Sequence, residues 1–241
     1  MVTDSGELVA RGVRVLGPEA PLLDDVSVVA VPGRILAVTG SSGSGKTTLL
    51  SVLGGLLAPN EGTVSFSGGP VGTTSGEPRP GTAFVLQTYG LVPSLTAEEN
   101  VSVALRAHGV GADEAARTAM ATLERVGVGD LADRLTSELS GGQLQRVAVS
   151  RALAVTPDVL LADEPTSELD AKTRDLVVDE IRREADRGVV VVLATHDSEV
   201  ADMCDDELHL VDGRSVVAVI RTVPTVEDGP GHEYDAFKRP S

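Results

Sequence analysis

The stretch that decides the fold is GSSGSGKTTLLSVLGG, which runs from Gly40 to Gly55. Its spacing Gly-x-x-x-x-Gly-Lys-Thr, residues 40–47, matches the phosphate-binding loop pattern, in which glycines allow backbone N–H groups to surround phosphate oxygens. The segment RILAVTG before it is expected to form a strand, and KTTLLSVLGGLLAP after it a helix that ends near Pro59. A Gly/Ser turn is the ordinary alternative, but strand, loop and helix together favour a nucleotide-binding site.

The composition of the 241 residues bounds the class of protein. Hydrophobic residues make up 41% and aromatic residues 2%, so the core must be built from Val, Leu, Ala and Ile, which suits buried parallel strands in an α/β protein. The formal net charge of −16 disfavours binding to nucleic acid and unaided docking to anionic lipid. The single cysteine, Cys204, excludes an internal disulfide. The start of the sequence has no apolar leader, and no stretch is apolar enough to span a membrane, so we expect a soluble cytoplasmic protein.

Four further segments are predicted to be strands. DVLLAD, residues 158–163, and GVVVVLATHD, residues 188–197, are apolar runs typical of parallel strands covered on both faces. Each ends in polar residues, at the end of the strand where open α/β sheets bind ligands, so these ends should converge on the glycine-rich loop. GTVSFSGGPV, residues 62–71, and GTAFVLQ, residues 81–87, are predicted to form an antiparallel flap beside the main sheet.

The segment after the flap is expected to be a helical insertion. One helix is predicted to begin after Thr96, whose spacing to Glu99 fits a capping box, and to end at Gly109. A second is predicted from Asp113 to Val126. The expected division of the chain is one domain over residues 1–223, with a helical subdomain at about 93–140, and a flexible tail at 224–241.

Four residues supply the chemistry that a nucleotide site needs. Lys46 places a cation at the β- and γ-phosphates, beside the positive end of the following helix. The hydroxyl of Thr47 can ligate Mg²⁺, and Asp163, which ends the predicted strand VLLAD, is placed to hold the same ion. Glu164 can accept the proton of an attacking water, which would turn a binding site into a hydrolytic one. A solvated acid after a strand is the alternative for Glu164 taken alone.

A longer motif, ELSGGQLQRVAVSRAL, runs from Glu138 to Leu153 and closely resembles the signature motif of ABC-type ATPases, the nucleotide-binding subunits of ABC transporters. The other motifs occur in the order of that family: the phosphate loop, Gln87 in VLQTYGLVPSLT, the signature, LLADEPTSELD, and His196 in LATHD. The resemblance covers nearly the whole chain up to about Gly213. It implies a P-loop NTPase of ABC type, an α/β fold with a mostly parallel core sheet, an antiparallel β flap and a helical insertion subdomain.

The resemblance implies a role for each residue that matches a family motif, with ATP and Mg²⁺ as the bound groups. Glu164 and His196 would be catalytic, His196 by contacting the γ-phosphate and orienting the attack, although position alone also allows a core or capping histidine. Mg²⁺ would be held by Thr47, Gln87 and Asp163. ATP would be bound by residues from four motifs: Gly40, Ser41, Ser42, Gly43, Ser44, Gly45, Lys46, Thr47, Thr48, Gln87, Ser140, Gly141, Gly142, Gln143 and Asp170.

The resemblance also implies a homodimer in the ATP-bound state. Ser140, Gly141 and Gly142 begin a predicted helix that runs to about Thr156, and the start of a helix is a phosphate site. In the family this second site faces the γ-phosphate held by the other subunit, so that two chains enclose two ATP molecules. Two chains of charge −16 should repel each other, and bound Mg-ATP would supply the attraction that is lost when the γ-phosphate leaves.

The implied partner is an integral membrane permease on a separate chain, which would place this protein at the inner face of the cell membrane. The phrases LLSVLGGLLAPNEGTV and LVPSLTAEENV resemble the subgroup of lipoprotein release and macrolide-type export, in which the permease transmits motion. A non-transport ABC ATPase of DNA maintenance is the first alternative, disfavoured by the acidic charge and by the short segment between phosphate loop and signature. A signalling ATPase that works a membrane partner without moving cargo is the second.

Two positions depart from the family pattern. Glu168 stands where a small or apolar residue is usual. The segment ARGVRVLGPEAPLL offers no aromatic residue to stack on adenine, so Val15 or Leu16 is expected to provide an apolar platform instead. Four features match no motif and are interpreted as surface features: His108, His209, His232 and the acidic run at residues 202–207.

Overall fold

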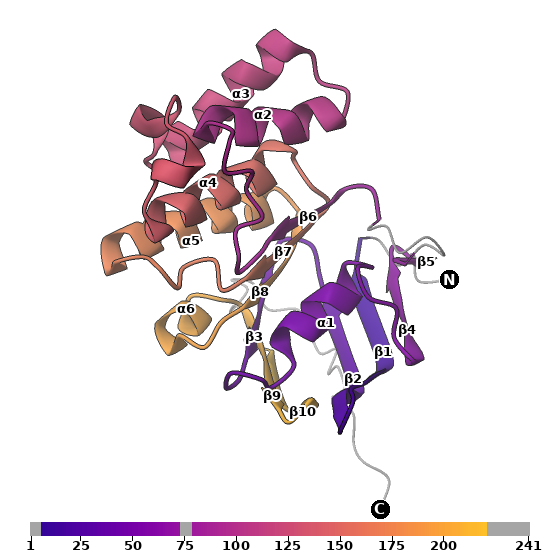
Figure 1. Cartoon of the computed structure of the whole chain (residues 1–241). Coiled ribbons are helices and arrows are strands. Elements are labelled where there is room, and N and C mark those ends of the chain that lie inside the picture. Colours follow the sequence, from indigo (N-terminus) through magenta and orange to yellow (C-terminus); the bar gives the residue numbers. More distant parts are fainter. Residues whose placement is uncertain (1–5, 73–78, 221–241) are drawn as a thin grey trace, which may run out of the picture.

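The computed structural model of the protein describes residues 6–72 and 79–220 (Figure 1). The predicted tail at 224–241 and His232 lie outside the described residues. Two sheets and the helices packed on them form the described part of the chain. No helix within residues 6–72 and 79–220 is long and apolar enough to cross a membrane.

The main sheet has six strands in the order β10-β9-β3-β8-β7-β6. Neighbouring strands from β6 to β9 run parallel, and only β10 pairs antiparallel, with β9. Every residue of β3, β7 and β8 is buried, as predicted for apolar strands covered on both faces. The strands are β3 (Ile35–Thr39), β6 (Thr82–Val85), β7 (Val159–Asp163), β8 (Val190–Ala194), β9 (Asp206–Val211) and β10 (Arg214–Ile220).

The second sheet is antiparallel, in the order β2-β1-β4-β5. Its strands are β1 (Leu8–Leu16), β2 (Pro21–Ala30), β4 (Glu61–Phe66) and β5 (Gly69–Pro70). The prediction that residues 81–87 belong to this flap is wrong, because β6 pairs parallel with β7 at the edge of the main sheet. Burial decides this, since Ala83 and Val85 of β6 join the same hydrophobic cluster as Val149 and Leu153 of helix α4 (Gly141–Ala154).

The helix after the phosphate loop, α1 (Lys46–Leu53), is shorter than predicted. It ends at Gly54, and the next residue, Gly55, adopts a left-handed φ of 77° that stops a helix. Gly54 also packs against the aromatic ring of Phe84: a Cβ at this position would lie 2.0 Å from Cζ of Phe84. This close approach fixes the end of α1 against the edge of the main sheet. The helix therefore ends well before Pro59, where the sequence had predicted its end.

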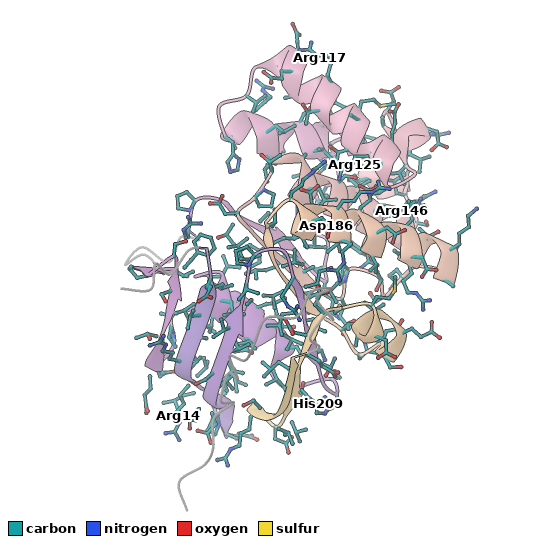
Figure 2. All side chains as sticks on the ribbon, turned by 180° about the vertical axis from the view of Figure 1, so that it is seen from behind. Arg14, Arg117, Arg125, Arg146, Asp186 and His209 are labelled. Carbon is teal, nitrogen blue, oxygen red and sulfur yellow. The ribbon has the colours of Figure 1, made fainter. Side chains whose placement is uncertain are left out.

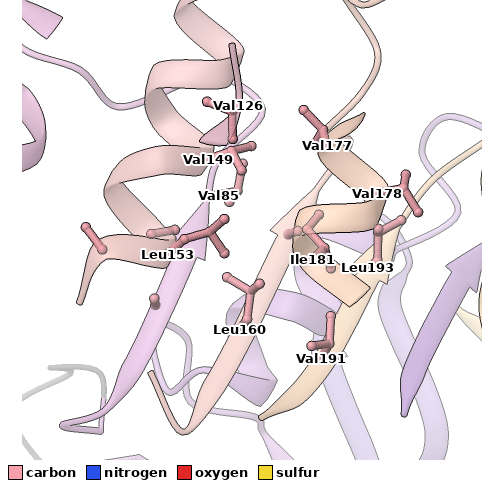
Figure 3. Close-up of a cluster of buried hydrophobic side chains, with 14 of the residues drawn as sticks. Val85, Val126, Val149, Leu153, Leu160, Val177, Val178, Ile181, Val191 and Leu193 are labelled. Atoms are coloured by element: carbon pink, nitrogen blue, oxygen red, sulfur yellow. The ribbon is translucent and has the colours of Figure 1, made fainter. Parts of the chain in front are cut away.

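The remaining helices lie on the other side of the main sheet, where three of them pack against the strands and the two helices of the insertion pack on α4 (Figure 1). The capping box at Thr96 is confirmed, with Thr96 N–H donating to Glu99 Oε2 at 2.8 Å and Glu99 N–H to Thr96 Oγ1 at 3.1 Å. Side chains of α4, α5 and strands β6 to β8 interlock in one aliphatic cluster (Figure 3). These helices are α2 (Ala97–Ala107), α3 (Ala112–Arg125), α4, α5 (Ala171–Asp186) and the short α6 (Ser198–Asp202). The bounds of the helical subdomain at 93 and 140 stay a prediction.

An ionic cluster ties the end of α3 to α5, and Figure 2 labels its arginine, Arg125. Arg125, at the end of α3, donates to Glu180 at 2.6 Å and to Glu184 at 2.8 Å, and both carboxylates are almost fully buried. Burial alone would lower the pKa of Arg125, but its hydrogen bonds to Glu184 and Glu180 outweigh burial and raise it. Removal of Arg125 would leave two buried acids short of a partner.

The prediction of surface features holds for Asp202, which is exposed, and is wrong for Asp206, Glu207 and His209. Arg34 donates to Asp206 at 2.7 Å, and the hydroxyl of Thr39 donates to Glu207 at 2.7 Å and lies 2.8 Å from Nδ1 of His209. The reason is that β9 lies inside the sheet, between β3 and β10, so these side chains meet partners on the neighbouring strand. His108 is exposed, as predicted.

Candidate active site

The phosphate loop joins β3 to α1 in a conformation that only glycine adopts easily. Gly40, Gly43 and Gly45 have φ values of 142°, 82° and 107°. A Cβ at Gly40 would lie 2.4 Å from the carbonyl oxygen of Leu210, and one at Gly45 would lie 2.8 Å from that of Leu22. Both the backbone angles and the neighbouring strands therefore require glycine, and the loop is closely held at the end of the sheet.

Lys46 lies at the base of this loop with its side chain only 8% exposed. Its ammonium donates to the carbonyl oxygens of Gly40 at 2.8 Å and Ser41 at 3.1 Å, and lies 4.0 Å from Oε1 of Glu164. The hydroxyl of Ser44 is buried and has no hydrogen-bond partner among the residues that the structure describes. A buried cation at the start of a helix fits a phosphate group.

Thr47 and Asp163 provide oxygen ligands of the kind that Mg²⁺ takes. The hydroxyl of Thr47, in the first turn of α1, donates to Oδ2 of Asp163, the last residue of β7, at 2.7 Å. Desolvation by burial raises the pKa of Asp163, opposed by the hydrogen bond from Thr47 and the charge of Lys46. Gln87 lines the same cavity. This donor set fits Mg²⁺, which usually keeps several waters and needs only one or two carboxylates.

Glu164 is held in an unusual backbone conformation directly after β7. Its φ of 51° is left-handed, its N–H donates to the carbonyl of Ala194 at 2.9 Å, and the residue is 7% exposed. Oε1 of its carboxylate lies 2.8 Å from Nδ1 of His196, which follows β8. A buried carboxylate oriented by an imidazole is an arrangement that can accept a proton from water.

These groups surround one cavity of about 530 Å³. Among the residues predicted for the site, eleven line it: Ser41, Ser42, Gly43, Gly45, Lys46, Thr47, Thr48, Gln87, Asp163, Glu164 and His196. Leu22 and Ser167 also line the cavity and were not predicted. Gly40 and Ser44 belong to the loop but do not line the cavity. The polar ends of β7 and β8 thus meet the phosphate loop, as predicted.

The apolar platform for the nucleotide base was predicted at Val15 or Leu16, and the structure brings a different residue, Leu22, to the cavity. Val15 is buried at 4% exposure, so it does not face a ligand, whereas Leu16 is 56% exposed. The apolar side chain that lines the cavity is Leu22, in the strand that follows the β1–β2 turn. It lies against Gly17, where a Cβ would come within 3.1 Å of it. The β1–β2 hairpin therefore presents Leu16 and Leu22, not Val15.

The signature residues form a second group that does not line the cavity. Ser140 precedes α4, and its N–H donates to Oε1 of Gln143 at 2.9 Å. Gly141 and Gly142 are the first residues of α4, and a Cβ at Gly142 would lie 2.7 Å from the carbonyl oxygen of Glu168. Asp170 caps α5 by accepting the N–H of Thr173 at 2.8 Å. The start of α4 therefore packs against the segment that precedes Asp170. It does not line the cavity beside the phosphate loop of the same chain.

One buried residue at this site was missed by sequence reasoning. The side chain of Gln145, 1% exposed, donates through Nε2 to the carbonyl of Glu164 and accepts the N–H of Glu168 at 3.0 Å. The signal in the sequence was its position: Gln145 falls on a face of α4 whose other members are apolar and buried, such as Val149 and Ala152. A glutamine on such a face needs hydrogen-bond partners in the core.

The fold and this site define the class of protein as an ATP-binding cassette. The family model "ABC transporter" matches residues 23–167, and the chain belongs to that family. A solved "Dimeric Structure" of a bacterial ABC transporter cassette superimposes with a TM-score of 0.82 at 32% identity, covering 90% of this chain and 99% of that one.

Three curated relatives are named as ATP-binding proteins, two of them as ABC transporter ATP-binding proteins. YbbA of Escherichia coli K12, an uncharacterized ABC transporter ATP-binding protein, is 40% identical over 204 residues, which cover 81% of this chain and 89% of YbbA. The lipoprotein-releasing system ATP-binding protein LolD 1 of Caulobacter vibrioides is 43% identical, covering 81% and 87%. An uncharacterized ABC transporter ATP-binding protein of Mycobacterium tuberculosis is 43% identical over 194 residues, 78% of this chain. The match spans 59% of the length of that mycobacterial relative.

Proposed function

We propose that this protein binds and hydrolyses ATP with Mg²⁺ and that, as a dimer, it powers a separate membrane permease. The observation that carries the proposal is the meeting of three functions in one cavity. Lys46 supplies the phosphate cation, Thr47 with Asp163 the metal ligands, and Glu164 with His196 the proton acceptor. Membership of the ABC transporter family indicates that the nucleotide is ATP and that its hydrolysis is coupled to transport.

The residues divide the chemistry between them. Lys46 and the N–H groups at the start of α1 bind the phosphates and offset their charge. Thr47, Asp163 and Gln87 would hold Mg²⁺, and the bound ion would supply positive charge beside the phosphates. Glu164 takes the proton of a water aimed at the γ-phosphate, and His196 keeps the carboxylate in position through its 2.8 Å contact.

The residues outside the cavity fit a dimer. Ser140, Gly141 and Gly142 are at the start of a 14-residue helix, whose free N–H groups suit a phosphate. The phosphate loop of the same chain does not reach them, so we propose that they contact the nucleotide bound by the partner subunit, with Gln143 and Asp170 beside them. The dimeric cassette of similar fold supports this arrangement.

For the permease, we propose the type served by lipoprotein-releasing ATPases or a related exporter, with this chain at the inner face of the membrane. The support is the resemblance of its local sequence to that subgroup and the 43% identity to LolD 1. DNA maintenance and signalling without cargo are the competing functions.

The experiment is a pull-down from membranes of the source cell with Glu164→Gln protein in Mg-ATP, read by mass spectrometry. The control is the same bait with Lys46→Ala, which is expected to bind Mg-ATP more weakly, at an ATP concentration that saturates only Glu164→Gln. Recovery of one polytopic membrane protein with Glu164→Gln and not with the control would support the permease. Recovery of DNA-associated partners instead would overturn the transport proposal and leave the ATPase chemistry standing.

A further inference from the structure

Gln145 connects the signature helix to the backbone of Glu164. Its side chain is 1% exposed, and both the nitrogen and the oxygen of its amide form hydrogen bonds. Nε2 donates to the carbonyl oxygen of Glu164, and Oε1 accepts the N–H of Glu168 at 3.0 Å. The five residues from Glu164 to Glu168 are therefore held at both ends by one side chain. An amide side chain offers a donor and an acceptor on separate atoms, which is what the two backbone groups require.

The segment that Gln145 holds needs an external support. Glu164 has a left-handed φ of 51°, which costs a non-glycine residue about 1 kcal/mol or more. The next residue, Pro165, has no N–H to contribute to a strand or helix. Apart from Gln145, the carbonyl of Glu164 receives only two long bonds, both at 3.3 Å, from the N–H and the hydroxyl of Ser167, among the residues that the structure describes. Gln145 is thus its principal partner.

We propose that Gln145 is a positioning residue for the proton acceptor. By fixing the carbonyl of Glu164, it fixes the direction of the side chain, whose carboxylate must stay between His196 and Lys46. This goes beyond the roles derived above, where no residue of α4 acts on the catalytic carboxylate of its own chain.

The same contacts give the signature a direct path to that carboxylate. Gln145 follows Gly141 by four residues, about 6 Å along the helix at 1.5 Å per residue. Gly142, one turn before Gln145, packs on the carbonyl of Glu168, the residue whose N–H Gln145 binds. A shift of the first turn of α4, such as binding of the partner's nucleotide would cause, moves both ends of the segment. This part of the inference rests on the proposed function.

The test compares ATP turnover by whole-chain variants with wild type. Gln145→Met keeps the volume and loses both hydrogen bonds, whereas Gln145→Glu keeps an acceptor for Glu168 and loses the donor to Glu164. Ser150→Ala is the matched control: it lies on the same helix, is fully buried, and removes a 3.4 Å bond to the carbonyl of Thr122, away from the cavity. Thermal unfolding and ATP binding are measured on the same samples.

We expect both Gln145 variants to lose 10-fold to 100-fold in kcat, with KM for ATP changed by less than about 3-fold, because a small misplacement of a catalytic group has effects of this order. Ser150→Ala should keep the wild-type kcat. The ratio of Gln145→Glu to wild-type activity should rise as the pH falls, because the carboxyl that this substitution introduces can, once protonated, again donate to the carbonyl of Glu164. The ratio of Gln145→Met to wild-type activity should not change with pH.

Several results would overturn the inference. One is an unchanged kcat in both variants, and another is a fall in kcat that Ser150→Ala shares. If Gln145→Met does not fold, a flat pH ratio for Gln145→Glu is by itself decisive against the proposal. A wild-type protein that turns over no ATP would instead count against the proposed function, so the two failures are distinguishable.

Discussion

Oε1 of Glu164 and Nδ1 of His196 lie 2.8 Å apart, at the ends of the neighbouring strands β7 and β8. The two side chains differ sharply in exposure, 9% for the glutamate and 66% for the histidine. The buried carboxylate is therefore oriented by an imidazole that remains open to the cavity. The same oxygen, Oε1 of Glu164, lies 4.0 Å from Nζ of Lys46, so the carboxylate stands between the imidazole and the lysine of the phosphate loop.

Glu164→Gln is expected to keep ATP binding and lose turnover. The amide has nearly the same shape and can still accept a hydrogen bond from His196, but it is a far weaker base, and loss of a general base costs about 100-fold or more. At saturating Mg-ATP the variant should accumulate a dimer, measured by size-exclusion chromatography with light scattering. A monomer under these conditions would contradict the expectation.

Lys46→Ala is expected to weaken Mg-ATP binding, measured by titration with a fluorescent ATP analogue. The ammonium is the cation that donates to Gly40 and Ser41 at the base of the loop, and a charged hydrogen bond contributes about 1.5–3 kcal/mol, or 10-fold to 100-fold in affinity. Lys172→Ala is the control, since Lys172 is exposed near the start of α5. Equal affinity in the two variants would argue against a phosphate role for Lys46.

The sequence motifs predicted the cavity because each of its segments is determined by residues close together in the sequence. The phosphate loop is encoded in its own glycines, and the polar ends of β7 and β8 must meet it wherever apolar parallel strands lie side by side. Eleven predicted residues line one cavity for that reason.

Residues whose partners lie far away in sequence were harder to predict. GTAFV pairs with β7 and not with the flap because Phe84 packs on Gly54 and its neighbours enter the main core. Gln145 is indistinguishable from an exposed helical glutamine until the chain brings Glu164 to it. His209 resembles a surface residue until β9 takes its place beside β3. In each case the position of the residue is determined by packing against distant segments, which a short stretch of sequence does not reveal.

The nucleotide base is expected to be held weakly and with little selectivity. Leu22 lines the cavity and Leu16 is exposed on the same hairpin, and the described residues that line the cavity include no Phe, Tyr or Trp. Wild-type kcat/KM for ATP and GTP should agree within about 5-fold, since apolar contact distinguishes the two bases poorly. Leu16→Tyr should raise ATP affinity about 10-fold, because stacking on a ring contributes about 1–3 kcal/mol.

Val103→Tyr is the control for this change, because Val103 is similarly exposed, at 49%, but lies on α2. Strong preference of the wild-type protein for ATP, or an unchanged affinity in Leu16→Tyr, would show that another part of the chain recognises the base.

The cap at Asp170 is expected to make the stability of the chain depend on pH. The carboxylate accepts the N–H of Thr173 at 2.8 Å, and its hydrogen bonds to the backbone and hydroxyl of Thr173 lower the pKa of Asp170. A pKa that is lower in the folded chain than in the unfolded one means stabilisation at neutral pH. That stabilisation is lost as the pH falls from the unfolded pKa, about 3.9, through the folded value.

Asp170→Ala should therefore lower Tm at pH 7, and its difference from wild type should shrink between about pH 5 and pH 3. Circular dichroism at 222 nm without nucleotide measures this, so that no role of Asp170 in a dimer enters the result. Asp170→Asn keeps an oxygen that caps the helix at every pH, and its smaller difference from wild type should change less with pH. If the deficit of Asp170→Ala were the same at pH 7 and pH 3, the charge of Asp170 would contribute nothing to the cap, and its hydrogen bond would act only through geometry.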